Sequence, residues 1–159
     1  MKTRLTLSLL FLLTIIYSCK KDHDQPAEET NFYLTALKSN NAWGTNSTYA
    51  GFVNDTLYLQ GYGNEETLHM KIKFVKIGKY SVTADQCSYF TTIGQDVMLS
   101  RYRLRSDTVS SVTITAYDPD KQIFTGTFDL SFIQTYPSNQ AKINFLNGKF
   151  RIAKVAFSY

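Results

Sequence analysis

Hydrophobic and polar residues alternate along short segments from residue 31 onward. Leu68, Met70 and Ile72, for example, alternate with His69 and Lys71. A period of two is typical of a strand with one buried and one solvated face. The pattern predicts strands over residues 31–37, 57–62, 68–74, 79–83, 89–93, 97–105, 112–117, 127–132, 142–146 and 149–155. No segment has the spacing of an amphipathic helix, so an all-β domain is expected.

Turn residues separate these predicted strands. Asn147-Gly148 carries the strongest hairpin signal, because a type I′ turn needs positive φ at both central residues. A second turn is predicted at 118–121, where the Asp118 side chain can bond the backbone that follows. Other reversals are predicted at Asn54-Asp55, Gly63-Asn64 and Ile77-Gly78. Turns about ten residues apart, without helices between them, predict a single antiparallel β-sandwich or β-barrel-like meander of about 8–10 strands.

The beginning of the chain has a different composition. Lys2 and Arg4 precede an apolar run that ends at Tyr17 and is followed by Ser18-Cys19. The run is too short for a membrane span of about 20 residues. The segment resembles a secretory signal with a bacterial lipobox, in which the chain is cut before the cysteine. This resemblance implies that Cys19 carries lipid and anchors the protein in a membrane.

The lipobox also divides the chain into three parts. Residues 1–18 are expected to be removed as a lipoprotein signal peptide. Residues 19–30 are charged and nearly free of apolar side chains, so they are expected to form a flexible lipidated tether. Residues 31–159 are expected to form the antiparallel β domain.

Charge and cysteine content narrow the possible functions. The formal net charge of +4 includes Lys2 and Arg4, so it falls to +2 (4 − 2) once the signal peptide is removed. This balance gives no reason to expect a nucleic-acid partner. Of the 2 cysteines, Cys19 is expected to be lipidated, which leaves Cys87 without an intramolecular partner. Cys87 is expected to be a small buried hydrophobic residue rather than a reactive thiol.

Three motifs in the C-terminal half carry a family resemblance. They are VTITAYD at 112–118, FTGTF at 124–128 and INFLNGKF at 143–150. The chain is similar to uncharacterised Bacteroidetes outer-membrane lipoproteins with the C-terminal pattern IT-x-YD … GTF … NG-x-F. The resemblance implies an all-β domain in the outer membrane and carries no known activity. Lys20-Lys21-Asp22 resembles the surface-export signal of such lipoproteins, which slightly favours the cell surface over the periplasmic face.

Tyr58, Gln60 and Tyr62 share one face of a predicted strand. Aromatic rings that stack on sugars, beside an amide that bonds their hydroxyls, make a glycan-binding face one hypothesis. The alternative is that tyrosine packs well on a half-buried strand.

Arg101, Arg103 and Arg105 also alternate along one predicted strand and should project from the same face. Their guanidinium groups could bind phosphates or carboxylates, as in lipid headgroups or acidic glycans. The alternative is that they protect an exposed edge strand from pairing with another sheet. Thr56 and Thr108 lie in Asp-Thr-aliphatic triplets that resemble O-glycan acceptor sites of Bacteroidetes exported proteins.

The sequence gives little support for a catalytic activity. The sequence has no H-E-x-x-H, G-x-S-x-G or P-loop motif, and His69 is expected to be exposed on a solvated strand face. No catalytic residue, metal ligand or cofactor is therefore predicted. A non-enzymatic binding module for a glycan or another envelope ligand is expected. The alternative is an accessory or structural subunit of an outer-membrane protein complex.

Overall fold

A computed structural model describes residues 31–155, and all of its regular structure is β. The strands are β1 (Tyr33–Lys38), β2 (Asn41–Thr45), β3 (Thr48–Val53), β4 (Thr56–Tyr62), β5 (Glu66–Lys73), β6 (Gly78–Val82), β7 (Cys87–Ile93), β8 (Val97–Leu104), β9 (Ser110–Asp118), β10 (Ile123–Tyr136) and β11 (Lys142–Ala153). The predicted signal peptide and the tether with Cys19 lie outside the described residues.

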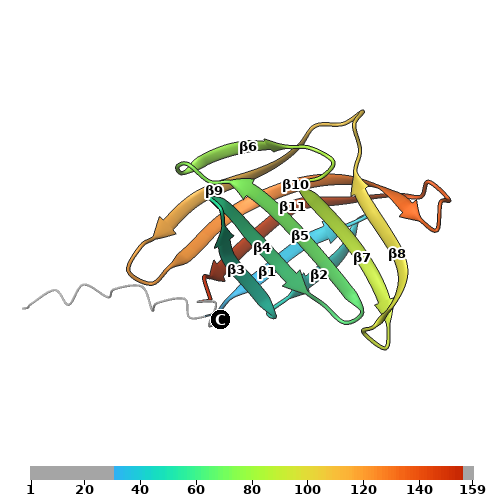
Figure 1. Cartoon of the computed structure of the whole chain (residues 1–159), viewed down its shortest axis with the longest axis horizontal. Coiled ribbons are helices and arrows are strands. Elements are labelled where there is room, and N and C mark those ends of the chain that lie inside the picture. Colours follow the sequence, from blue (N-terminus) through green and yellow to red (C-terminus); the bar gives the residue numbers. More distant parts are fainter. Residues whose placement is uncertain (1–30, 156–159) are drawn as a thin grey trace, which may run out of the picture. The chain divides into compact units, whose positions relative to one another are not determined.

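The 11 strands belong to one antiparallel sheet that curls around its own core. The strand order is β2-β1-β11-β10-β8-β7-β5-β4-β3, and β9 branches from β10 and also pairs with β6. Figure 1 shows β3, β4, β5, β7 and β8 lying across β1, β2 and β11, so that two halves of the sheet face each other. The all-β antiparallel prediction is confirmed, but the sheet has 11 strands and is not closed into a barrel.

The core fills the space inside this curl. Strand alternation places the aliphatic residues of β4 and β5 inward, among them Leu59 and Met70, which are fully buried. Five phenylalanines complete the centre of the core, namely Phe124, Phe128, Phe132, Phe145 and Phe150. All five come from β10 and β11, which are the two longest strands. These two strands therefore hold the halves of the sheet together.

The predicted hairpin at Asn147-Gly148 is wrong, because both residues lie inside β11. Phe128 faces Gly148 while Leu130 faces Phe145, so Leu146 and Asn147 of β11 oppose the single Asp129 of β10, and β11 carries one extra residue. This is a β-bulge, in which Asn147 has φ 53° and its backbone N–H donates to Asp129 Oδ1 at 2.9 Å. The positive φ of Asn147, which would suit a hairpin turn, occurs here in a bulge. The predicted strands 142–146 and 149–155 are consequently one strand.

Two strands were not predicted. β2 has no buried residue, and β3 buries only Ala50 and Gly51, so neither has a marked hydrophobic alternation. They form the two ends of the sheet path.

Two predicted turns are confirmed. The Asp118 carboxylate accepts from the backbone N–H groups of Asp120 and Lys121, each at 3.0 Å. The Asn54-Asp55 reversal is also present, with positive φ at both residues.

Two glycines of the C-terminal motifs are covered by phenylalanine rings from the opposite strand. Gly126 pairs with Phe150, and Phe128 pairs with Gly148. A Cβ atom at Gly148 would lie 2.5 Å from the Phe128 ring, and one at Gly126 would lie 2.4 Å from Phe150 Cζ and 2.1 Å from the Thr113 carbonyl oxygen. The two rings stack on each other with centroids 6.5 Å apart. Only glycine permits this close approach of ring to backbone.

The Gly148 pair predicts a specific destabilisation. Gly148→Ala should lower the free energy of unfolding by about 2–3 kcal/mol, because the new methyl overlaps the Phe128 ring. The loss should be smaller in a Phe128→Leu background, where a smaller side chain leaves room. Urea denaturation of the four proteins in this cycle measures both effects. Gly63→Ala is the control, since its Cβ would meet nothing closer than 3.6 Å. Additive losses from the two substitutions would refute the steric explanation.

Candidate functional site

The outer face of β4, β5, β7 and β8 brings together side chains from both predicted ligand-binding sets. Residues directly opposite each other on adjacent strands share a face of the sheet. Two outward rows therefore cross the four strands. The first row is Tyr62, Thr67, Phe90 and Arg101, and the second is Gln60, His69, Ser88 and Arg103. The tyrosine end and the arginine end of this face belong to one continuous surface.

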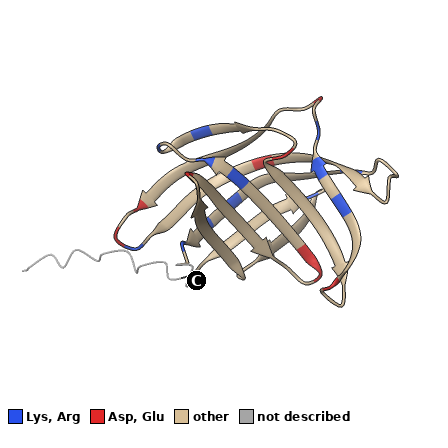
Figure 2. Ribbon diagram, viewed as in Figure 1, with Lys and Arg blue, Asp and Glu red and all other residues tan. Residues whose placement is uncertain are grey.

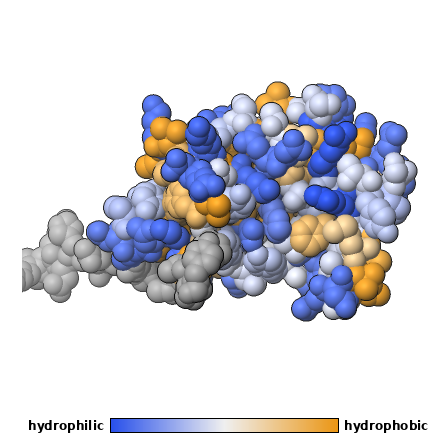
Figure 3. All heavy atoms as spheres, viewed as in Figure 1, coloured by the Kyte–Doolittle hydropathy of each residue, from blue (hydrophilic) through white to orange (hydrophobic). Residues whose placement is uncertain are grey.

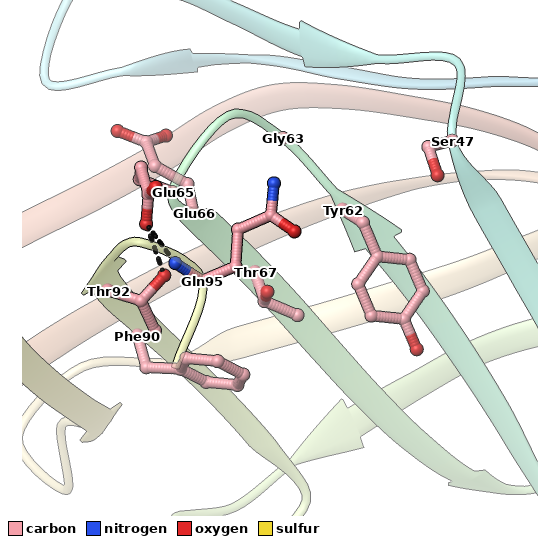
Figure 4. A pocket seen from close by; sticks show the side chains of 9 residues that line it. All are labelled: Ser47, Tyr62, Gly63, Glu65, Glu66, Thr67, Phe90, Thr92 and Gln95. Atoms are coloured by element: carbon pink, nitrogen blue, oxygen red, sulfur yellow. Dashed lines mark hydrogen bonds between the residues drawn. The ribbon is translucent and has the colours of Figure 1, made fainter. Parts of the chain in front are cut away.

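A cleft of about 550 Å³ lies at one end of this face, where the β4–β5 and β7–β8 turns meet. Figure 4 shows the rings of Tyr62 and Phe90 on the two sides of Thr67, with the Gln95 side chain beside them. Ser47, Gly63, Glu65, Glu66 and Thr92 complete the lining. The cleft thus offers two flat rings together with hydroxyl, amide and carboxylate groups.

Glu65 links the β4–β5 turn to the β7–β8 turn, and these two turns form the rim of the cleft. Its carboxylate accepts from Thr92 Oγ1 at 2.7 Å and from the Gln95 backbone N–H at 3.1 Å, and its carbonyl accepts from the Thr92 N–H at 3.0 Å. These hydrogen bonds hold the pKa of the Glu65 carboxyl below its usual value. Glu65 and Gln95 both have positive φ, at 57° and 66°. These contacts hold the rim in a defined conformation.

Glu66 points the other way, into a polar cluster on the inner face. Its carboxylate is bonded by Lys38 Nζ and by the indole N–H of Trp43. Lys38 Nζ also donates to the Tyr89 hydroxyl at 3.2 Å. Burial, and then the nearby Glu66, raise the pKa of Tyr89, so its hydroxyl stays protonated. Both oxygens of Glu66 are thus engaged inside the domain.

His69 is half-buried rather than exposed as expected. Its ring centroid lies 6.4 Å from that of Tyr62 and 5.3 Å from that of Phe90, both in edge-to-face geometry. Burial, with a smaller contribution from the charge of Lys71, lowers the pKa of His69. The imidazole is therefore neutral at pH 7 and supports the two rings that border the cleft.

Tyr62 is the predicted tyrosine that reaches the cleft. Burial raises the pKa of its hydroxyl, which donates to Gln60 Oε1. Gln60 therefore orients Tyr62 but does not line the cleft. Tyr58 lies outside the cleft as well, where Lys71 Nζ stands 5.6 Å from the centroid of its ring. The hypothesis of a contiguous Tyr58–Gln60–Tyr62 contact surface thus reduces to Tyr62 at the cleft.

A second hollow of about 370 Å³ lies at the arginine end of the face. Lys71, Arg101 and Arg103 line it together with Ser88, Thr135 and the loop residue Asp85. Figure 2 shows this concentration of Lys and Arg on β5 and β8, with acidic residues at the far end of β5. β8 is paired to β7 on one side and to β10 on the other at both arginines. Protection of an edge strand therefore does not explain Arg101 and Arg103.

Arg105 does not belong to this hollow. β8 ends at Leu104, and the Arg105 guanidinium forms a two-point pair with Asp107, with Nε–Oδ1 and Nη2–Oδ2 distances of 2.8 Å and 2.7 Å. This pair raises the pKa of Arg105 and lowers that of Asp107. Arg105 is therefore paired with Asp107 and does not line the hollow of Arg101 and Arg103.

The two suggested O-glycan acceptors differ in accessibility. Thr56 begins β4 and is partly exposed, whereas the Thr108 hydroxyl oxygen is buried. Within residues 31–155 no group of three or more His, Cys, Asp or Glu side chains is placed to hold a metal ion. The same residues contain no helix that could cross a membrane.

Sequence reasoning missed Phe90 and Gln95. Phe90 alternates with Tyr89 and Thr91 in a predicted strand, which gives its face but not its neighbours. Its place beside Thr67 depends on the pairing of β7 with β5. Gln95 lies in a turn whose contact with Glu65 joins residues 30 positions apart. No local pattern could have found either contact.

Residues 30–153 match the family model described as a domain of unknown function, DUF6252. The chain belongs to the DUF6252 family. No curated protein and no solved structure matches it. The match to DUF6252 covers every strand from β1 to β11.

Cys87 lies beneath the second hollow and should be unreactive. The residue is 2% exposed, and burial raises the pKa of its thiol to about 12. Since only the thiolate reacts, alkylation by iodoacetamide at pH 8 should be roughly two to three orders of magnitude slower in the folded protein than in urea. A Cys19→Ala variant leaves Cys87 as the single cysteine to be followed by mass spectrometry. Equal labelling rates in buffer and in urea would show that the thiol is accessible.

Proposed function

We propose that this protein is a lipid-anchored lipoprotein of the bacterial outer membrane whose β domain binds glycans without transforming them. The anchor rests on the lipobox resemblance at Cys19, and Lys20-Lys21-Asp22 favours display at the cell surface. The binding activity rests on the cleft at the end of β4, β5 and β7.

The pairing of Tyr62 with Phe90 around the cleft is the observation that carries this proposal. The C–H faces of a sugar ring are apolar and stack on aromatic rings, while its hydroxyls need hydrogen-bond partners. Tyr62 and Phe90 supply the rings, and Gln95, Thr67 and Ser47 supply polar groups at the same cleft. An amide both donates and accepts, which suits a hydroxyl. A volume of about 550 Å³ falls within the range of small-molecule sites.

The state of the two carboxylates favours binding over hydrolysis. Glycoside hydrolysis commonly requires one carboxyl group with a raised pKa and a second that faces the substrate. Hydrogen bonds from Thr92 and Gln95 lower the pKa of Glu65 instead. Glu66 is turned inward and engaged by Lys38 and Trp43. Neither residue has the environment of a general acid.

A second candidate function is an accessory subunit of an envelope protein complex. Four apolar side chains at the β7–β8 hairpin are exposed, namely Ile93 at 57%, Val97 at 56%, Met98 at 42% and Leu99 at 50%. Figure 3 shows hydrophobic residues gathered toward this end of the face, at the lower right. Exposed apolar side chains that cluster on a surface are typical of protein interaction sites.

Removal of the Tyr62 ring tests the glycan proposal. Tyr62→Ala should weaken binding on a glycan array by about tenfold or more, because one stacking surface is lost. Near- and far-UV circular dichroism should stay native, since Tyr62 is 41% exposed. Tyr33→Ala, an outward tyrosine at the start of β1, is the matched control. If no glycan binds the native protein, or if both variants bind like it, the cleft is not a glycan site.

A pull-down of the full lipidated protein from detergent-solubilised membranes tests the second candidate. A complex subunit should recover a partner in near-stoichiometric amount, and Cys19→Ala should lose that partner through mislocalisation. A Val97→Ser/Leu99→Ser variant should also lose it if the hairpin is the contact. Recovery of the protein alone would count against a complex subunit.

A further inference from the structure

We propose that the glycan bound by this domain is anionic, and that its carboxylate or phosphate group lies in the second hollow against Arg101 and Arg103. This inference rests on the proposed glycan-binding function and specifies the chemistry of its ligand. It comes from the geometry that joins the two hollows and from the charges around them.

The two hollows meet at a single cross-strand pair. Phe90 lines the aromatic cleft, Arg101 lines the second hollow, and the two residues are directly opposite each other on β7 and β8. Cβ atoms of such a pair are about 4.5–5.5 Å apart. A sugar ring stacked on Phe90 therefore places its ring substituents within reach of the Arg101 guanidinium.

The cations of the second hollow have no anionic partner in the described part of the chain. The ion pairs of residues 31–155 are Lys38–Glu66 and Arg105–Asp107. Lys71, Arg101 and Arg103 take part in neither. Asp85 is the acidic residue of this hollow and takes part in neither ion pair, so the lining carries a formal charge of +2 (3 − 1). Cations gathered without partners repel one another and favour an anion between them.

Arginine side chains at this spacing suit an oxyanion. Arg101 and Arg103 are two residues apart on one strand, so their Cα atoms lie about 7 Å apart and their side chains leave the sheet in the same direction. Each guanidinium presents a planar fork of donors that matches a carboxylate or a phosphate. The Ser88 hydroxyl lies opposite Arg103 and adds a further donor.

The distribution of charge also fixes the orientation of the ligand. The carboxylate of Glu65 stands at the far end of the aromatic cleft and would repel an anionic substituent there. The neutral, hydroxyl-rich part of the ligand therefore lies between Tyr62 and Gln95. The anionic part lies past Phe90, toward Arg101.

Matched pairs of sugars test the inference. The full chain in detergent is applied to an array that pairs uronic-acid oligosaccharides with the corresponding neutral hexose oligosaccharides, and hexose 6-phosphates with unmodified hexoses. The anionic member of a pair should bind about ten- to a hundredfold more tightly at low salt, and added salt should reduce this preference. The two kinds of pair distinguish carboxylated from phosphorylated ligands.

An Arg101→Gln/Arg103→Gln variant should bind the anionic member no better than the neutral one while keeping its affinity for the neutral one. Lys79→Gln/Lys149→Gln removes the same charge at exposed positions outside both hollows and should keep the preference. Equal binding of both members by the native protein, or an unchanged preference in the arginine variant, overturns the inference and leaves the proposed function standing. Absence of binding to every sugar overturns both.

Discussion

Close packing of two phenylalanine rings on two glycines is the constraint on which the rest of this sheet depends. The pairs Gly126–Phe150 and Phe128–Gly148 join β10 to β11 in reciprocal order, so each strand supplies one ring and one bare backbone position. The rings then fill the centre of the curl without forcing the strands apart. Because β10 and β11 connect the two halves of the sheet, their separation fixes how tightly the sheet curls.

The position of the outer face follows from how β10 divides its partners. Its first half pairs with β9, and its second half pairs with β8, beginning at Phe132. From β8 the sheet continues through β7, β5 and β4, which carry the two outward rows. The cleft and the second hollow are thus positioned by the same series of paired strands. The outward side chains of Tyr62, Phe90, Arg101 and Arg103 do not belong to the core cluster.

Much of the fold was predictable from local pattern, because alternation in segments such as Leu68–Ile72 reports burial directly. The edge strands β2 and β3 could not be predicted, because so few of their residues are buried that they show no hydrophobic alternation. Asn147 shows a different limit: its positive φ was foreseen, but the sheet uses it in a bulge. At the site, the outward face of Tyr62 was predictable. Its proximity to Phe90 and Gln95 was not, because strand register and turn contacts are tertiary properties.

The two adjacent glutamates Glu65 and Glu66 have separate structural roles. Glu66 bonds Lys38 and Trp43 on the inner face of the sheet, whereas its neighbour Glu65 shapes only the rim. Substitutions at the rim can therefore leave the contacts of Glu66 intact. The same adjacency makes the turn intolerant of length change. Inserting one residue after Glu65 would break its alignment with Thr92 and Gln95 and so remodel the rim, while the Lys38–Glu66 pair is kept.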